Sequence, residues 1–274
     1  MRISRYFRIY LAIARNCLVR EMSFRGHFLI TAATETLWFA LQIIFFEVIF
    51  MNNGGKPIAG WTEYEVLFLL GTQHLITQFF EMFFFTNCMD ISEQVRTGTL
   101  DFVLIKPINP QFLLSTRKLN FNSVANIPIA FAILGYSGYK LGVHLTFTNV
   151  LVYIALILCG VLILYNTLFI MALSAFWVIK NQSLFELWFP VRNFARYPID
   201  MYPPSFKFAL TFVFPILAVT NFPAMALMPF TTEMNRSGLV PMHALFVAGW
   251  AIGMLFVGHL FFRFALNHYR SASS

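Results

Sequence analysis

The chain has 274 residues, of which 58% are hydrophobic and only 11% are charged, and its formal net charge is +7. Soluble domains carry about 25% charged residues, so this composition excludes an ordinary soluble protein and predicts an integral membrane protein. The basic residues are distributed among loops rather than gathered in one patch, which argues against a nucleic-acid-binding protein. The three cysteines are widely spaced, so neither a disulfide framework nor a zinc site is indicated.

Residues 1–26 are expected to form a basic amphipathic helix. Six arginines alternate there with apolar residues at helical spacing. This pattern predicts a helix that lies along an anionic leaflet of the membrane, with its arginines at the headgroups. A simple basic tail that only sets the orientation of the chain is the alternative, and it predicts the same orientation.

The rest of the chain predicts an all-α integral membrane fold with six transmembrane helices. The spans are long enough for roughly 30 Å of hydrocarbon, and they cover about residues 27–50, 64–86, 119–141, 147–179, 208–230 and 240–264, followed by a tail at 265–274.

Two of these spans have unusual features. The third is weaker than the others and contains Pro128, and residues 180–207 are expected to form a polar and aromatic connector before the fifth. Pro215, Pro223 and Pro229 interrupt the fifth span. We therefore expect a broken helix that partly re-enters the membrane, which is tolerated only where protein or a cavity covers the backbone.

The distribution of positive charge predicts the orientation. With six spans, all basic residues except Lys56, Lys140 and Arg236 fall on the side that also holds both termini. Positively charged loops mark the cytoplasm, so both termini and the loop between the second and third spans are expected to be cytosolic.

That cytosolic loop contains a compact segment at 90–110. Asp90 is predicted to cap a short helix, and Glu93 and Arg96 can pair at i, i+3. Gly98 suits a left-handed C-cap, after which a second short turn begins. The pattern fits either an amphipathic loop on the membrane surface or a docking element for another protein.

Polar residues inside the first two spans form a second feature. They are Glu35 and Gln42 in the first span, and Gln73, Thr77, Gln78 and Glu81 in the second. Because buried charge in a membrane is costly, such residues face protein or water. One interpretation is a substrate cavity whose carboxylates attract a cationic or amphipathic compound. The other is a hydrogen-bond network between packed helices.

The sequence gives no sign of catalysis or of metal binding. The six histidines have no metal-ligand spacing, and the chain contains neither a nucleophile elbow nor a phosphate-binding loop. The chain is therefore predicted to be non-catalytic, and any work it performs must draw energy from a partner or an ion gradient.

The stretch from Gln94 to Phe112 resembles the permease subunits of type 2 ABC exporters. It contains R-x-G-x-L-D, a hydrophobic run, and then K-P and N-P-x-F, which is similar to one subgroup of these permeases. The basic N-terminal helix, the proline-broken fifth span and the C-terminal tail are also similar, so the resemblance covers nearly the whole chain.

The resemblance implies a permease in a prokaryotic inner or plasma membrane that exports a hydrophobic or amphipathic small molecule, cationic ones included, by alternating access. It implies two separate ATPase subunits, which bind ATP and Mg²⁺, and a second permease that is identical or homologous, with no cofactor on this chain. The segment at 90–110 would be the coupling helix, and its candidate docking residues are Glu93, Arg96, Thr97, Gly98, Leu100 and Asp101.

Other functions remain open from the residues alone. The same architecture could export a lipid or a glycan. Glu35 and Glu81 could instead serve an ion-coupled or proton-coupled secondary transporter. A membrane scaffold or sensor that moves no substrate is a third possibility.

Overall fold

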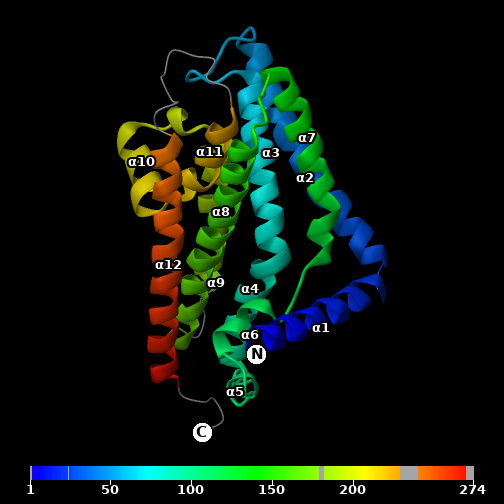
Figure 1. Ribbon diagram of the computed structural model, residues 1–274, viewed down its shortest axis with the longest axis vertical. Coiled ribbons are helices and arrows are strands. Elements are labelled where there is room, and N and C mark those ends of the chain that lie inside the picture. Colours follow the sequence, from blue (N-terminus) through cyan, green and yellow to red (C-terminus); the bar gives the residue numbers. More distant parts are fainter. Residues whose placement is uncertain (1, 24, 179–181, 229–239, 270–274) are drawn as a thin grey trace.

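The computed structural model describes residues 2–23, 25–178, 182–228 and 240–269, and these ranges contain helices and no named strand (Figure 1). Pro229, Arg236, Lys180 and the end of the predicted tail lie outside the described residues. The helices are α1 (Arg2–Ser23), α2 (Arg25–Asn52), α3 (Glu63–Phe80), α4 (Thr86–Arg96), α5 (Asp101–Leu104), α6 (Pro110–Thr116), α7 (Ile127–Leu141), α8 (Phe147–Leu173), α9 (Gln182–Asn193), α10 (Pro204–Phe208), α11 (Ile216–Leu227) and α12 (Val240–His268).

The long helices run lengthwise beside one another and give the bundle two distinct ends (Figure 1). Helices α1, α5 and α6 lie at one end, which we call the α1 end, and α12 finishes there as well. The 53–62 loop lies at the opposite end, which we call the loop end, and α10 and α11 are close to it. The sequence predicted a basic N-terminal helix that lies along the membrane surface, and in the structure α1 is a helix that lies obliquely at the α1 end (Figure 1).

Three described helices are long and apolar enough to cross a membrane: Gly26–Asn52, Phe147–Phe176 and Met242–His268. The number rises to five if two bent helix pairs each count as one span. Helix α3 is not among these, because polar side chains such as Gln73, His74 and Gln78 lower its hydropathy. The chain is therefore a membrane-embedded helical protein.

The second predicted span continues far beyond the expected end of the membrane. A π-helical segment, Glu81–Phe85, joins α3 directly to α4, so one continuous helical rod extends from Glu63 to Arg96. Asp90 lies inside α4 and pairs with Lys118, so the prediction that Asp90 caps a new helix was wrong. The physical reason is that neither glycine nor proline interrupts residues 81–96, so nothing ends the helix.

The third predicted span is shorter than expected. A 3₁₀ turn, Phe121–Asn126, precedes α7, which begins at Ile127 with Pro128 in its first turn. Proline is tolerated there because an N–H in the first turn has no partner inside the helix. The axis bends by 53° between α6 and the Phe121–Leu141 segment.

The region at 180–207 differs most from the prediction of a connector at one end of the bundle. The Trp188 ring packs against Phe80 at the α4 side of α3, with 6.1 Å between ring centroids. Further along, Asp200 Oδ2 accepts a hydrogen bond from Trp61 Nε1 at 3.0 Å in the loop-end connection. Residues 188–200 therefore run along the length of α3, from its C-terminal end near Phe80 to its N-terminal end near Trp61.

The predicted fifth span at 208–230 is bent sharply in the middle. Its two arms, Pro204–Val213 and Ile216–Leu227, meet at an angle of 91°. The first arm begins at the loop end, where Lys207 Nζ lies 2.7 Å from Asp200 Oδ1. The second arm returns to that end, where Phe222 stacks on His243 near the start of α12, with 4.1 Å between ring centroids. The segment is a hairpin of two arms, the geometry of a broken span or of a re-entrant loop, and residues 182–201 cross beside it along α3.

Tertiary hydrogen bonds make this irregular crossing possible. Asn221 on α11 accepts a bond from the Ile199 N–H at 2.8 Å and donates one to the Tyr197 carbonyl at 3.3 Å. Irregular backbone in a membrane protein is stable only where other protein groups satisfy it in this way. The hairpin also packs tightly on α8, since a Cβ at Gly160 would lie 3.1 Å from the Val219 carbonyl oxygen.

Candidate functional site

The loop that follows α4 is fastened to that helix by side-chain contacts. The Asn87 side chain donates to the Lys118 carbonyl at 2.7 Å and accepts from the Lys118 N–H at 2.8 Å. The Lys118 ammonium also pairs with the Asp90 carboxylate. Asn87 is only 2% exposed, so these bonds do not compete with water. Residues 97–118 are thereby held to the same rod as α3.

The C-terminus of α4 presents a preorganised ion pair to solvent. Arg96 donates to both carboxylate oxygens of Glu93, at 2.9 and 2.7 Å, and both side chains are exposed. Thr97 Oγ1 donates to the Glu93 carbonyl at 2.8 Å, and Gly98 ends the helix with φ of 72°. The pairing and the left-handed cap agree with the sequence prediction. Hydrogen bonds from Arg96 hold the pKa of Glu93 below its ordinary value, so this carboxylate stays charged at neutral pH.

The short helix α5 separates its apolar residues between two faces. Leu100 is 0% exposed and Val103 is 2% exposed, so both pack inside the chain. Phe102 and Ile105, in contrast, are 67% and 77% exposed. Leu100 was predicted as a docking residue, but its side chain is buried and serves as an anchor for the turn. Asp101 lies between the two faces and is half-buried.

We define the docking surface by its exposed members at the α1 end: Glu93, Arg96, Thr97, Phe102 and Ile105. Sequence reasoning missed Phe102 and Ile105. Helical spacing could have indicated them. Each lies two positions after a residue of the buried pair Leu100 and Val103, and residues two positions apart on a helix point in different directions. The surface combines two exposed apolar side chains with a fixed ion pair.

A largely buried ion pair lies where α3 meets the π-helical segment. Glu81 is the first residue of the π-helical segment, and its Oε1 lies 2.7 Å from Arg192 Nη1 on α9. The two side chains are only 18% and 16% exposed. The sequence did not predict this partner, because residues 180–207 were assigned to a connector outside the membrane.

The second predicted carboxylate, Glu35, connects α2 with the start of the third span. The Asn126 side chain donates to Glu35 Oε2 at 2.7 Å and accepts from Thr36 Oγ1 at 2.9 Å. Asn126 is fully buried, so it links the two elements through a protected contact. Asn126 was likewise absent from the predicted site.

The remaining predicted cavity residues pack between helices. Thr77 and Gln78 are buried, and Gln73 Nε2 donates to Thr77 Oγ1 at 3.0 Å. Among the described residues, Gln42 Nε2 and Gln78 Oε1 have no hydrogen-bond partner. In this conformation the predicted cavity residues therefore form a polar layer between packed helices. Gln42 Nε2 and Gln78 Oε1 are the two groups of this layer named above that have no hydrogen-bond partner in the described part of the chain.

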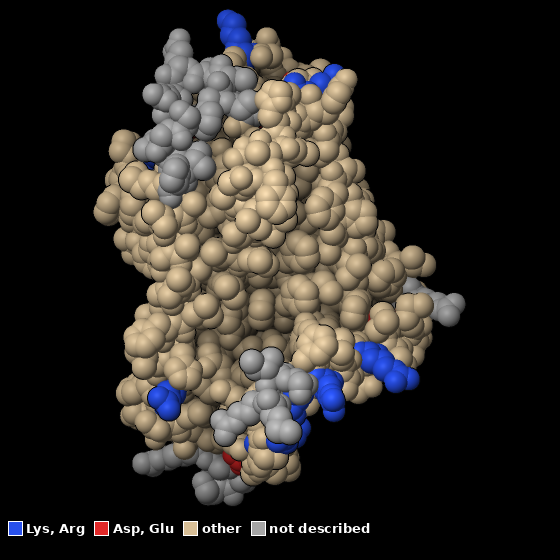
Figure 2. Space-filling view, viewed as in Figure 1, with Lys and Arg blue, Asp and Glu red and all other residues tan. Residues whose placement is uncertain are grey.

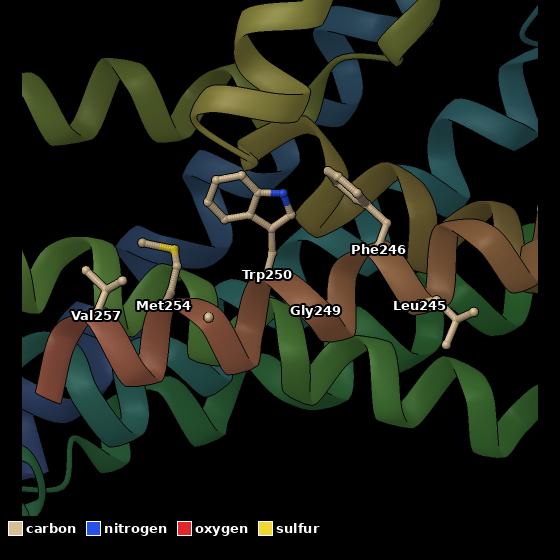
Figure 3. A pocket seen from close by; sticks show the side chains of 7 residues that line it. Leu245, Phe246, Gly249, Trp250, Met254 and Val257 are labelled. Carbon is tan, nitrogen blue, oxygen red and sulfur yellow. The ribbon is translucent and has the colours of Figure 1, made fainter. Parts of the chain in front are cut away.

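A hollow of about 510 Å³ follows α12 (Figure 3). Trp250 and Phe246 project from one side of the helix, and Leu245 points in a different direction. The lining is apolar and contains none of the predicted cavity residues. Within the part of the chain that the structure describes, no group of three histidine, cysteine or acidic residues could hold a metal ion.

Comparison with known families identifies the architecture. The model of a family described as ABC-2 family transporter protein matches residues 36–273, which is most of the chain. Comparison with curated proteins and with solved structures gave no match. The matched range includes the α3–α4 rod, the docking surface, the hairpin and α12. The chain therefore belongs to the ABC-2 transporter family, as a membrane component of the kind that associates with ABC ATPases.

Proposed function

We propose that this chain is the permease of an ATP-driven ABC exporter and that the docking surface binds the ATPase. The observation that carries the proposal is the continuous rod from Glu63 to Arg96. This rod carries the docking surface near one end and the Glu81–Arg192 ion pair at its π-helical segment. A displacement of the docking surface would therefore move helices inside the membrane directly.

The charge distribution supports a cytosolic α1 end. Arg5, Arg8 and Arg15 on α1 are exposed at this end, as is Lys106 next to the docking surface. Figure 2 shows basic side chains along the lower edge of the visible face. Lys207 moves to the loop end in the structure, but the excess of basic residues at the α1 end persists, and positive charge favours the cytoplasmic side. Both termini would then face the cytosol.

The π-helical segment supplies a place where the rod can change shape. Such segments contain a wider turn than an α-helix and are frequent at functional sites. ATP-driven closure of two ATPase subunits would move the docking surface, and the Asn87–Lys118 clamp would carry that movement into α3. The Glu81–Arg192 pair would then pull on the irregular crossing at 182–201. A change of packing at this point switches the permease between inward-open and outward-open states.

A second permease, identical or homologous, would complete the transport path. The most apolar part of α2 has only 6% of its residues buried. Leu37 and Trp38 are exposed on this helix and suit either lipid or the second permease. The Glu35 side chain lies half-buried on the same helix, close to the face where the two permeases would meet.

The polar layer supports a hydrophobic or amphipathic substrate. Arg192 forms an ion pair with Glu81, whereas Glu35 forms none within the described residues and is bonded by Asn126. Gln42 Nε2 and Gln78 Oε1, which have no hydrogen-bond partner among the residues with described positions, could bind polar atoms of a substrate. A small amphipathic cation matches this combination of one acidic group, two amides and surrounding apolar surface.

The proposal is tested by transport in proteoliposomes that contain the chain and an ATPase subunit that copurifies with it. A fluorescent amphipathic cation such as ethidium reports movement across the bilayer. We expect movement that requires ATP and continues when a protonophore dissipates the proton gradient. Movement that needs no ATPase and stops on addition of the protonophore would show a secondary transporter instead.

A further inference from the structure

A second hollow, of about 500 Å³, lies near the α1 end between α1, α6, the π-helical segment and α8. Its apolar wall is formed by Phe84, Leu162 and the ring of Tyr165. Its polar wall includes Tyr6, Asn109 and Gln111. The hollow thus has an apolar interior and a hydrogen-bonding side at the same depth as the amphipathic helix α1.

Contacts from three separate elements build this hollow. The Asn109 N–H donates to Tyr6 Oη at 3.3 Å, and the Tyr6 ring packs edge-on against Phe112, with 4.9 Å between ring centroids. These contacts seat α1 on α6. On another side, His259 Nδ1 on α12 lies 2.7 Å from Gln111 Oε1. The polar wall is therefore held in place by helices from both ends of the sequence.

The floor of the hollow is also fixed. Ser115 Oγ and Tyr165 Oη lie 2.6 Å apart, and both residues are buried. This bond satisfies the two hydroxyl groups, so the floor presents mainly the Tyr165 ring to an occupant. An apolar chain can therefore enter the hollow without leaving a buried hydroxyl unpaired.

Exposed basic residues lie close in sequence to the wall residues of α1 and α6 and to His259 of α12, which contacts the wall residue Gln111. Arg5 directly precedes Tyr6, Lys106 lies three residues before Asn109, and Arg263 lies one helical turn beyond His259 on the same face of α12. None of these three cations takes part in an ion pair within the described residues, and no acidic residue lines the hollow. The elements around the hollow therefore carry exposed positive charge at the α1 end.

We propose that this hollow binds an anionic phospholipid from the leaflet at the α1 end. The phosphate lies at the mouth near Arg5, Lys106 and Arg263, and its oxygens accept hydrogen bonds from the polar wall. The first part of an acyl chain occupies the apolar interior against Phe84 and Leu162. A bound lipid would hold α1 against α6 and thereby stabilise residues 97–118, which carry part of the docking surface. This inference is independent of the proposed ATP-driven transport.

Native mass spectrometry of the full chain in detergent tests the site. The probes are phosphatidylglycerol and phosphatidylcholine with identical acyl chains. The variant Arg5→Gln/Arg263→Gln removes two cations from the mouth, and the control Arg15→Gln/Lys56→Gln removes two exposed cations elsewhere. We expect wild type to prefer phosphatidylglycerol, and the mouth variant to bind it about tenfold more weakly, while the control stays within about twofold of wild type.

A second variant tests the apolar interior without any change of charge. Leu162→Trp fills part of the hollow, and we expect it to weaken binding of phosphatidylglycerol about tenfold as well. Equal losses in the mouth variant and in its control would overturn the proposal, because they would show general attraction to the membrane surface. Wild-type affinity in either the mouth variant or Leu162→Trp would also overturn it.

Discussion

Replacement of Arg192 by alanine is expected to lower the free energy of unfolding by about 3–5 kcal/mol, because it leaves the Glu81 carboxylate without its partner in a mostly buried position. The same substitution should slow transport, since it cuts the direct link between the π-helical segment and α9. Thermal or denaturant unfolding in detergent micelles measures the first effect, and the ethidium assay measures the second.

A double-mutant cycle separates the pair from its surroundings. The cycle comprises Glu81→Leu, Arg192→Leu and the double variant Glu81→Leu/Arg192→Leu, which removes the two charges together, so we expect the double variant to be clearly more stable than Arg192→Leu. It should still transport slowly, because apolar side chains restore packing but not the ionic link. Losses of stability that simply add across the cycle would show that the two side chains do not interact.

Replacement of Asn87 by leucine is expected to uncouple ATP hydrolysis from transport while binding of the ATPase persists. The substitution leaves the Lys118 N–H and carbonyl without their partner, at a cost of roughly 1–3 kcal/mol for each buried group that stays unsatisfied. The docking surface itself is unchanged, but its connection to the α3–α4 rod is loosened. The ratio of ethidium moved to ATP hydrolysed measures this loss.

Asn16→Leu provides the matched control, because Asn16 is exposed on α1 and takes no part in the clamp. It should keep the wild-type ratio of transport to hydrolysis. An unchanged ratio in Asn87→Leu would contradict the role of the clamp. Lys118→Met, which removes only the ion pair with Asp90, should give a smaller effect in the same direction.

The sequence predicts the parts of this fold that depend on local physics. Helices α2, α8 and α12 follow from long apolar runs, and each passes the length and composition test for a membrane span. The Glu93–Arg96 pair follows from i, i+3 spacing, and the left-handed turn at Gly98 follows from the conformational freedom of glycine.

The crossing at 182–201 could not be predicted in the same way. It contains Pro190 and Pro198, its only α-helix spans Gln182–Asn193, and it carries Arg192, so it lacks every local mark of a membrane span. Arg192 pairs with Glu81, and Asn221 bonds the Ile199 N–H and the Tyr197 carbonyl, so the partners Glu81 and Asn221 both lie outside the segment. Such partners become visible only when the helices are packed.

The docking surface shows a similar limit. The resemblance singles out the stretch from Gln94 to Phe112 but does not tell which of its residues face outward. Leu100 and Phe102 are both apolar and only two positions apart, yet one is buried and the other is exposed. Helical spacing indicates that the two side chains point in different directions, but contact of the short helix α5 with the rest of the chain decides which of them is buried.

Binding of the ATPase to the docking surface is the central claim, and copurification with the ATPase subunit tests it most directly. The variant Phe102→Asp/Ile105→Asp places two charges in the exposed apolar part of the surface, and Tyr139→Asp/Leu145→Asp places two charges on exposed residues toward the loop end. We predict that the first variant loses the ATPase while the second retains it, with both keeping wild-type thermal stability. Full retention of the ATPase by a stably folded Phe102→Asp/Ile105→Asp variant would contradict the account.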